Sequence, residues 1–249
     1  MEGTPQGGSL SPLLANVLLD EVDKELEKRG HSFVRYADDL NVYVGSKRAG
    51  ERVMLALRSM YAKLKLQVNE EKSAVAPVAE RKFLGFTISV SGGQATVAVA
   101  AKSIEKFKMK VRQLTTGSGG RSMAAVTQKL SVYLRGWHGY FGQADPCYLF
   151  GNLDSWIRRR LRCVQLQLWK HGRGIYRSLR QLGINDERAR GVAAHAGRWW
   201  WLSGRLANSV LPTKYFDQLG LYRMKPKSEH SSNRPVRTRT PGGVAGDGR

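Results

Sequence analysis

Two adjacent carboxylates are the feature of this sequence best suited to chemistry. Asp38 and Asp39 lie between two short segments rich in aromatic and β-branched residues, 33–36 and 40–44. Neighbouring carboxylates repel each other, and a divalent cation removes that repulsion. Mg²⁺ is suited to such a pair because it binds one or two carboxylates and completes its shell with water and substrate phosphates. The alternative is a polar turn, in which Asp is common, and the dipeptide alone favours that alternative.

The segments around the two carboxylates predict how they are positioned. Ser11 and Pro12 predict an N-cap and first turn, and Gly30 an end, for an amphipathic helix of about 17 residues. Its apolar residues recur at steps of four, which predicts one buried face: Leu14, Leu18, Val22 and Leu26. Segments 33–36 and 40–44 then predict a β-hairpin with the two carboxylates at its tip.

The rest of the chain changes from mixed to helical. Residues 48–66 have helical spacing, and residues 82–99 predict a strand pair turned at Ser91-Gly92-Gly93. From residue 100 the pattern predicts helices over 104–114, 122–141, 152–170 and 187–208. Residues 225–249 are Ser, Asn, Pro, Gly and Arg with almost no large apolar side chain, which predicts a disordered basic tail.

The charge of the 249-residue chain is one-sided and unevenly distributed. Its formal net charge is +21, of which +1 belongs to residues 1–99, +15 to 100–222 and +5 to 223–249. Such an excess predicts a polyanionic partner, nucleic acid above all. The surface that binds it is expected mostly in residues 100–222. No stretch approaches the ~18 apolar residues of a membrane span. With Cys147 and Cys163 as the only cysteines, neither a disulfide scaffold nor a Cys-rich zinc module is expected, and a reducing cytoplasm is the default.

Two further motifs favour a functional role for Asp38 and Asp39 over a simple polar turn. Thr4 to Pro12 (TPQGGSLSP) places glycines directly before a helix start, where backbone can approach a nucleic-acid strand. Phe83-Leu84-Gly85-Phe86 places a glycine between bulky residues in a predicted strand, which indicates close approach of another backbone.

With these motifs in order, the sequence resembles the reverse transcriptases/maturases encoded by bacterial group II introns. The matching blocks are Pro-Gln-Gly-Gly at residue 5, Tyr-Ala-Asp-Asp at 36, Asn-Glu-Glu-Lys-Ser at 69 and Phe-Leu-Gly-Phe at 83. Residues 133–141 (YLRGWHGYF) and 153–160 (LDSWIRRR) resemble the thumb, or maturase region. The resemblance implies an α+β fold, with a partial palm (helix, β-hairpin, helix, strands) over 1–99 and an all-α thumb/maturase domain over 100–224.

The resemblance also implies roles for single residues in an RNA-directed DNA polymerase. Asp38 and Asp39 would be catalytic ligands of Mg²⁺, with Asp38 the stronger candidate. The template and incoming deoxynucleotide triphosphate would contact Gln6, Gly7, Gly8, Tyr36 and Lys72. The primer grip would be Phe83, Leu84, Gly85 and Phe86. Intron RNA would contact Arg135, Arg158, Arg159, Arg160, Arg162 and Lys170.

One element of the family's site is not found in this sequence. The family has a third catalytic aspartate on a strand before the Gln-Gly block, together with fingers and further palm strands. We therefore expect a C-terminal fragment that does not polymerise alone. It would be either part of a longer or split protein, in which a companion chain could supply those parts, or a gene remnant. Partners would be group II intron RNA and an RNA template with a DNA primer. The alternative is a non-catalytic, intron-RNA-binding splicing factor.

The remaining aromatic and polar residues favour structural roles. Tyr133, Trp137, Tyr140 and Phe141 share one predicted helix face, which is more typical of a core than of a base-stacking surface. Trp199, Trp200 and Trp201 cannot share one face, so one indole remains available to stack on RNA. The histidines show no metal-ligand spacing.

Overall fold

The computed structural model describes residues 8–91, 93–116, 122–145 and 148–225. It comprises two units, residues 1–116 with 139–146 and residues 117–138 with 147–249. Helix α4 (Met123–Phe141) contributes to both. Among the described residues, no helix combines the length and apolar character needed to cross a membrane. The predicted basic tail lies outside the described residues, apart from Lys225.

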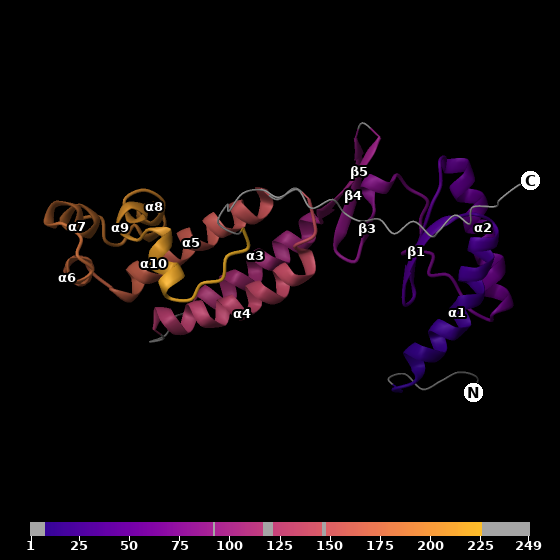
Figure 1. Cartoon of the computed structure of the whole chain (residues 1–249), viewed down its shortest axis with the longest axis horizontal. Coiled ribbons are helices and arrows are strands. Elements are labelled where there is room, and N and C mark those ends of the chain that lie inside the picture. Colours follow the sequence, from indigo (N-terminus) through magenta and orange to yellow (C-terminus); the bar gives the residue numbers. More distant parts are fainter. Residues whose placement is uncertain (1–7, 92, 117–121, 146–147, 226–249) are drawn as a thin grey trace, which may run out of the picture. The chain divides into compact units, whose positions relative to one another are not determined.

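The first unit begins with two helices and a hairpin around a small apolar cluster (Figure 1). Its elements are α1 (Ser11–Lys28), β1 (Ser32–Tyr36), β2 (Asp39–Tyr43) and α2 (Lys47–Lys63). Val22 and Leu26 of α1 and Leu57 of α2 are buried, and Phe33, Leu40 and Val42 of the hairpin pack against them. The predicted order of helix, hairpin and helix is confirmed.

Helix α1 differs from its prediction in where it buries apolar surface. Ser11 is the first residue of the helix and Leu10 is the N-cap, with no side-chain hydrogen bond at the cap. Leu19 is buried with Val22 and Leu26, whereas Leu14 and Leu18 of the predicted stripe are exposed. In the described part of the unit, the apolar side chains of the first two turns of α1 stay exposed. Steps of four therefore marked an apolar stripe without showing how much of it would be covered.

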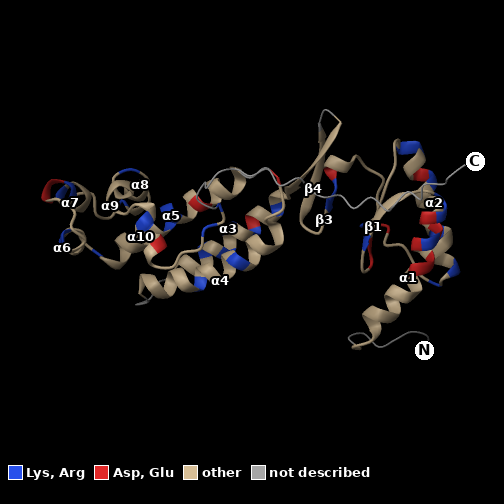
Figure 2. Ribbon diagram, viewed as in Figure 1, with Lys and Arg blue, Asp and Glu red and all other residues tan. Residues whose placement is uncertain are grey.

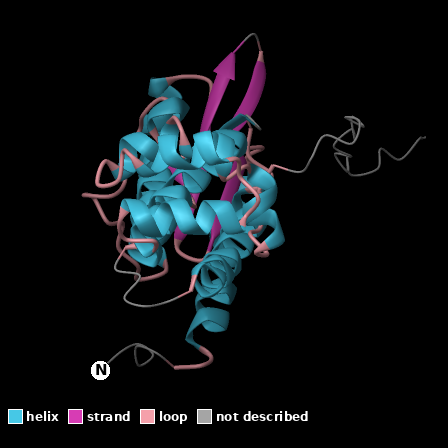
Figure 3. Cartoon of the chain, turned by 90° about the vertical axis from the view of Figure 1, so that its left-hand side faces the viewer, coloured by secondary structure: helices cyan, strands magenta, loops and turns pink. Residues whose placement is uncertain are grey.

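A three-stranded antiparallel sheet and α3 complete the described part of this unit. The elements are η1 (Val78–Glu80), β3 (Lys82–Phe83), β4 (Phe86–Ser91), β5 (Gln94–Val99) and α3 (Ala101–Thr115). The strand order is β3-β4-β5, with Phe86 opposite Val99 and Ser91 opposite Gln94. The predicted pairing is confirmed by β4 and β5, whose hairpin stands out in Figure 3. The first predicted strand is divided, because Lys82 and Phe83 form the separate short strand β3. Gly92 of its turn lies outside the described residues.

The second unit is helical around α5 (Tyr148–Leu168), which has ten buried residues. Helices α8 and α9 contact α5, and α6 and α7 contact each other. The shorter helices are α6 (Gly172–Gln181), α7 (Asp186–Ala193), α8 (Trp199–Gly204), α9 (Ala207–Val210) and α10 (Thr213–Gln218). The α+β class is confirmed by the two sheets of the first unit and the helices of both.

The single helix predicted over 187–208 is wrong. The structure has α7, α8 and α9 there, and Gly197 between α7 and α8 has a φ of +99°, which ends helical continuation. The apolar spacing continued across the break because each short helix still buries a face, as Val192, Leu202 and Ala207 show.

Candidate active site and nucleic-acid interface

The two carboxylates lie at a tight turn between β1 and β2. Tyr36 pairs with Asp39 in the antiparallel register, which leaves Ala37 and Asp38 as the turn. Ala37 has a φ of +54°, a left-handed conformation that costs a residue with a Cβ about 1–2 kcal/mol. Both Asp side chains and Tyr36 are exposed, so the turn presents two carboxylates to solvent.

Arg35 ties this turn to α1. Its Nε donates to Asp23 Oδ1 at 2.9 Å, its Nη1 donates to Asn16 Oδ1 at 2.8 Å, and Nη1 also donates to the Ala37 carbonyl at 3.0 Å. The Arg35 and Asp23 side chains are only 13% and 19% exposed. Hydrogen bonding to Asp23 raises the pKa of the already basic Arg35 guanidinium. Arg35, held by Asp23, thus holds the strained residue of the turn through the Ala37 carbonyl.

The donor set at the turn fits a hard divalent cation in part. Carboxylate oxygens are the ligands Mg²⁺ prefers, and one or two suffice when substrate phosphates and water complete the shell. Among the described residues, no group of three His, Cys, Asp or Glu side chains could enclose a metal. Asp38 and Asp39 can thus supply two ligands of an open site, in which substrate must supply others.

The predicted template and nucleotide residues are only partly described. Gln6 and Gly7 lie outside the described residues, and Gly8 accepts a hydrogen bond from Ser11 N at 3.1 Å through its carbonyl. Lys72 has an exposed side chain, and its carbonyl accepts from Arg81 Nη2 at 2.9 Å. The roles of these residues stay predictions.

The predicted primer grip forms a turn, rather than the continuous strand that was expected. Leu84 and Gly85, with φ of +51° and +83°, connect β3 to β4. Gly85 is closely approached, but by side chains rather than by the backbone that was predicted: an added Cβ would lie 2.9 Å from Ser103 Oγ and 3.2 Å from Phe141 Cζ. Ser103 Oγ donates to the Gly85 carbonyl at 3.0 Å, which fixes this turn on α3.

The aromatic stripe predicted for the core is divided in the structure. Phe141 is buried and its ring lies 5.0 Å from that of Phe86. Tyr133 and Trp137 are half-buried, whereas Tyr140 is 52% exposed and donates its hydroxyl hydrogen to the Leu84 carbonyl at 3.0 Å. Phe141 and Tyr140 therefore support the Leu84-Gly85 turn directly.

Two of the arginines predicted to contact RNA are interior residues. Arg158 and Arg162 are each 6% exposed. Arg162 Nε donates to the Leu211 carbonyl at 2.9 Å, and burial lowers the pKa of its guanidinium. The run of arginines predicted a cationic surface, but α5 is covered over so much of its circumference that Arg158 and Arg162, one helical turn apart, point inward. As folded, these two do not offer their guanidinium groups to a phosphate backbone.

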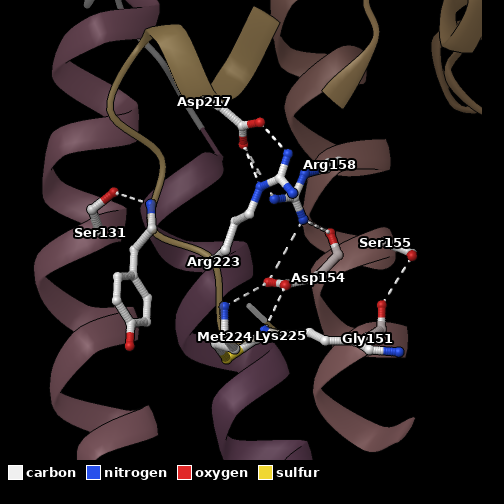
Figure 4. Close-up of polar contacts among 10 residues, drawn as sticks. Ser131, Gly151, Asp154, Ser155, Arg158, Asp217, Arg223, Met224 and Lys225 are labelled. Atoms are coloured by element: carbon white, nitrogen blue, oxygen red, sulfur yellow. Dashed lines mark hydrogen bonds and ion pairs between the residues drawn. The ribbon is translucent and has the colours of Figure 1, made fainter. Parts of the chain in front are cut away.

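Arg158 belongs to a polar network that holds the 217–225 segment (Figure 4). Its Nη2 lies 3.5 Å from Asp217 Oδ1, and Arg223 forms a second ion pair with Asp217. Asp154 accepts from the backbone N–H groups of Met224 and Lys225 at 3.3 and 3.1 Å. The 217–225 segment therefore supplies partners for the charged groups of Arg158 and Asp154, which are buried on α5.

The other predicted RNA contacts are closer to the surface. Arg135 and Lys170 have exposed side chains, and the Arg135 guanidinium lies 5.8 Å from the Tyr222 ring centroid. Arg159 and Arg160 are half-buried beside indole rings, at 4.1 Å from Trp200 and 5.8 Å from Trp156 respectively. These four remain candidates for phosphate contact.

Several residues that position the site were missed by sequence reasoning. Asn16 and Asp23 lie on the same face of α1, about two turns apart, but nothing in the sequence pairs them with Arg35. Asp154 could have been found as the i,i+4 partner of Arg158, whereas Asp217 is 59 positions further along the chain from Arg158. Contacts over such separations depend on the tertiary fold.

The comparisons with known proteins match both units. The family described as reverse transcriptase (RNA-dependent DNA polymerase) matches residues 1–88, and the group II intron, maturase-specific domain matches residues 104–183. The retron Ec86 reverse transcriptase of Escherichia coli is 25% identical over 146 residues, which cover 57% of this chain and 42% of that protein. The chain therefore spans less than half the length of this relative.

The fold and the two matches define a class, that of proteins joining a reverse transcriptase segment to a maturase segment. In these two matches the chain is similar to group II intron-type reverse transcriptases/maturases.

The clamp on the turn leads to a prediction for Arg35→Ala. We expect a loss of about 1–3 kcal/mol in the free energy of opening the hairpin, because Asp23 is left nearly buried without its partner. Hydrogen–deuterium exchange by mass spectrometry on peptides covering 33–43 measures it. Arg29→Ala is the matched control, since its pair with Glu25 is solvent-exposed and should contribute much less to the stability of the fold. Equal protection in the two variants would contradict the clamp.

The Asp217 network predicts an acid-sensitive second unit. Hydrogen bonds from Arg223 hold the pKa of Asp217 below its ordinary 3.8. A carboxyl whose pKa is lowered by folding stabilises the fold above its unfolded pKa, and that stability is lost as pH falls through the folded pKa. Urea unfolding followed by tryptophan fluorescence, from pH 6 to pH 2.5, should show this decline, because all six tryptophans lie in this unit.

Asp217→Asn should be less stable than the parent at pH 6 and should show a shallower decline. Glu187→Gln, which changes an exposed carboxyl of the same unit, should follow the parent. A parallel pH profile for Asp217→Asn and the parent would show that the network does not carry the acid sensitivity.

Proposed function

We propose that this chain is part of an RNA-directed DNA polymerase and group II intron maturase. The observation that carries the proposal is the exposed Asp38-Asp39 turn, clamped by Arg35 within the segment that matches reverse transcriptases. The substrates would be deoxynucleotide triphosphates and a DNA primer on an RNA template. The second unit would bind group II intron RNA, supported by its maturase-domain match and basic charge. Such substrates favour a cytoplasmic location.

The chain's own residues explain how the turn could serve this chemistry. Asp38 and Asp39 place hard oxygen ligands at the surface. Arg35 holds the backbone of the turn at the Ala37 carbonyl and is itself bound to α1. Bound there with substrate, Mg²⁺ would lower the pKa of the primer 3′-hydroxyl and neutralise charge on the leaving pyrophosphate. Lys72, exposed in the same unit, would attract the triphosphate.

We further propose a companion segment that completes the palm. The first half of α1 exposes an apolar surface of five side chains: Leu10, Leu13, Leu14, Val17 and Leu18, each 39–65% exposed. In the described residues, β1 and β2 form a sheet of only two strands, so each has one edge without a strand partner. Strands covering this surface would bury it and could bring the third carboxylate that the family resemblance implies.

A non-catalytic splicing factor is the second candidate function. Residues 100–222 carry 21 basic and 6 acidic side chains, whereas residues 1–99 are almost neutral. A chain whose first unit only supported the second would have this distribution. The two functions differ in whether Asp38 is needed.

Asp38→Ala separates the two functions. In a primer-extension assay of the chain supplemented with the companion palm segment, we expect the variant to lose more than about 100-fold in rate, because several kcal/mol of charge stabilisation depend on the metal. Affinity for intron RNA, measured by filter binding, should change by less than twofold. Glu51→Ala, an exposed carboxylate of α2, is the matched control and should retain both.

The outcomes of this experiment are distinct. Equal loss of extension and RNA binding in Asp38→Ala would contradict the division between the units. Full extension by Asp38→Ala would contradict the catalytic role of Asp38. No extension by the parent chain with its companion segment, with RNA binding intact, would leave the splicing factor as the better function. Robust cDNA synthesis by the purified chain alone would contradict the need for a companion.

RNA binding should depend strongly on salt. With ~6 phosphate contacts, affinity should fall by about 10³ between 50 and 200 mM salt, because each contact releases condensed counterions. A titration by fluorescence anisotropy at four salt concentrations measures the slope. A flat response would show that the basic helices do not contact the phosphate backbone.

A further inference from the structure

Helix α8 (Trp199–Gly204) places two indole rings at the surface of the second unit. Trp200 and Trp201 are 44% and 41% exposed, while Leu202 and Ser203 of the same helix are buried. Exposed aromatic rings next to each other are unusual on a surface that only has to remain soluble, and such patches mark interaction sites. The helix lies beyond residues 104–183, which match the maturase-specific domain.

Each exposed indole contacts another planar side chain of the same unit. The Arg159 guanidinium carbon lies 4.1 Å from the centroid of the Trp200 ring, and Arg159 Nη2 donates to the Trp200 carbonyl at 3.2 Å. The His195 ring lies 5.1 Å from that of Trp201, at an interplanar angle of 31°. Both indoles are therefore oriented before any ligand arrives, which lowers the entropy lost on binding.

Gly204 shows that the space around Arg159 is tightly used. A Cβ at this position would lie 2.9 Å from both Cζ and Nε of Arg159. Ser203 Oγ donates to the Trp200 carbonyl at 2.7 Å, which fixes the same turn of backbone from the buried side. The cation and the ring are thus held as a stacked pair by their surroundings.

The charges around α8 favour a polyanion. Residues 188–216 contain no Asp or Glu and five cations: Arg188, Arg190, Arg198, Arg205 and Lys214. Arg198 and Arg205 directly flank α8 and are exposed, and cations of this part of the chain are seen in Figure 2. An apolar protein partner would have to bury these cations without counter-charges, which is costly. Nucleic acid supplies both phosphates for the cations and flat bases for the rings.

We propose that α8 is a binding site for single-stranded RNA, with bases stacked on Trp200 and Trp201 and phosphates at Arg198 and Arg205. The proposal rests on the proposed RNA-binding function of the second unit and adds the strandedness and site of the ligand. Bases in an RNA duplex are stacked on each other and are not available to an indole, so a loop or unpaired segment is required.

The experiment uses the full chain and a fluorescein-labelled 12-nucleotide oligouridine, alone or annealed to its complement. Trp200→Ala should weaken binding to the single strand at least about fivefold and leave duplex binding within twofold. Trp200→Phe should recover most of the single-strand affinity, because a ring face is restored. Single-strand binding should also quench part of the tryptophan fluorescence in the parent, and less of it in Trp200→Phe.

Tyr148→Ala is the matched control, because Tyr148 is an exposed aromatic residue of α5 in the same unit. It should bind both RNAs as the parent does, and circular dichroism should give all variants similar melting temperatures. Unchanged single-strand affinity in Trp200→Ala, or an equal loss for the duplex, would overturn the proposal while leaving RNA binding by the second unit intact. If the parent bound anionic vesicles more tightly than the single strand, and Trp200→Ala weakened only vesicle binding, the proposal would also be overturned. Failure of the parent to bind either RNA would remove the proposed function as well.

Discussion

The hydrogen bond between Arg35 and the Ala37 carbonyl is the interaction on which the candidate site depends. A two-residue turn that starts with a left-handed alanine is strained, and two neighbouring carboxylates at its end repel each other. Arg35 counters the strain, since it donates a hydrogen bond to the carbonyl of the left-handed alanine. Its own position is fixed by Asp23 and Asn16, so the orientation of the hairpin tip is set from α1.

The apolar cluster below the hairpin makes that clamp possible. Val22 and Leu26 bring α1 under β1 and β2, and Asp23 lies between them on the same turn of the helix. The same helix leaves apolar side chains of its first half exposed in the described unit. Helix α1 thus combines a part that fixes the turn with an apolar surface that fits the proposed companion segment.

In the second unit, the arginines of α5 are divided between interior and surface. Arg158 and Arg162 are paired with a carboxylate and backbone carbonyls and hold the 211–225 segment on α5. Arg159 lies against an exposed indole instead. Burying a cation without partners would destabilise the fold, so the inward arginines require Asp154, Asp217 and the carbonyls that surround them. The positive charge counted from the sequence is therefore larger than the charge available to RNA.

Local patterns determined much of this protein. The α+β class, the hairpin that ends in Asp38 and Asp39 and the basic character of the second half follow from periodicity, turn chemistry and residue type, which act over a few neighbouring positions. The tertiary structure decided which face of α1 is covered, where 187–208 breaks into three helices, and which arginines point inward. It also decided that Arg35 meets Asp23 and that Arg158 meets Asp217. These depend on contacts between segments far apart in the chain, and burial and pairing at such distances leave no periodic trace in a single sequence.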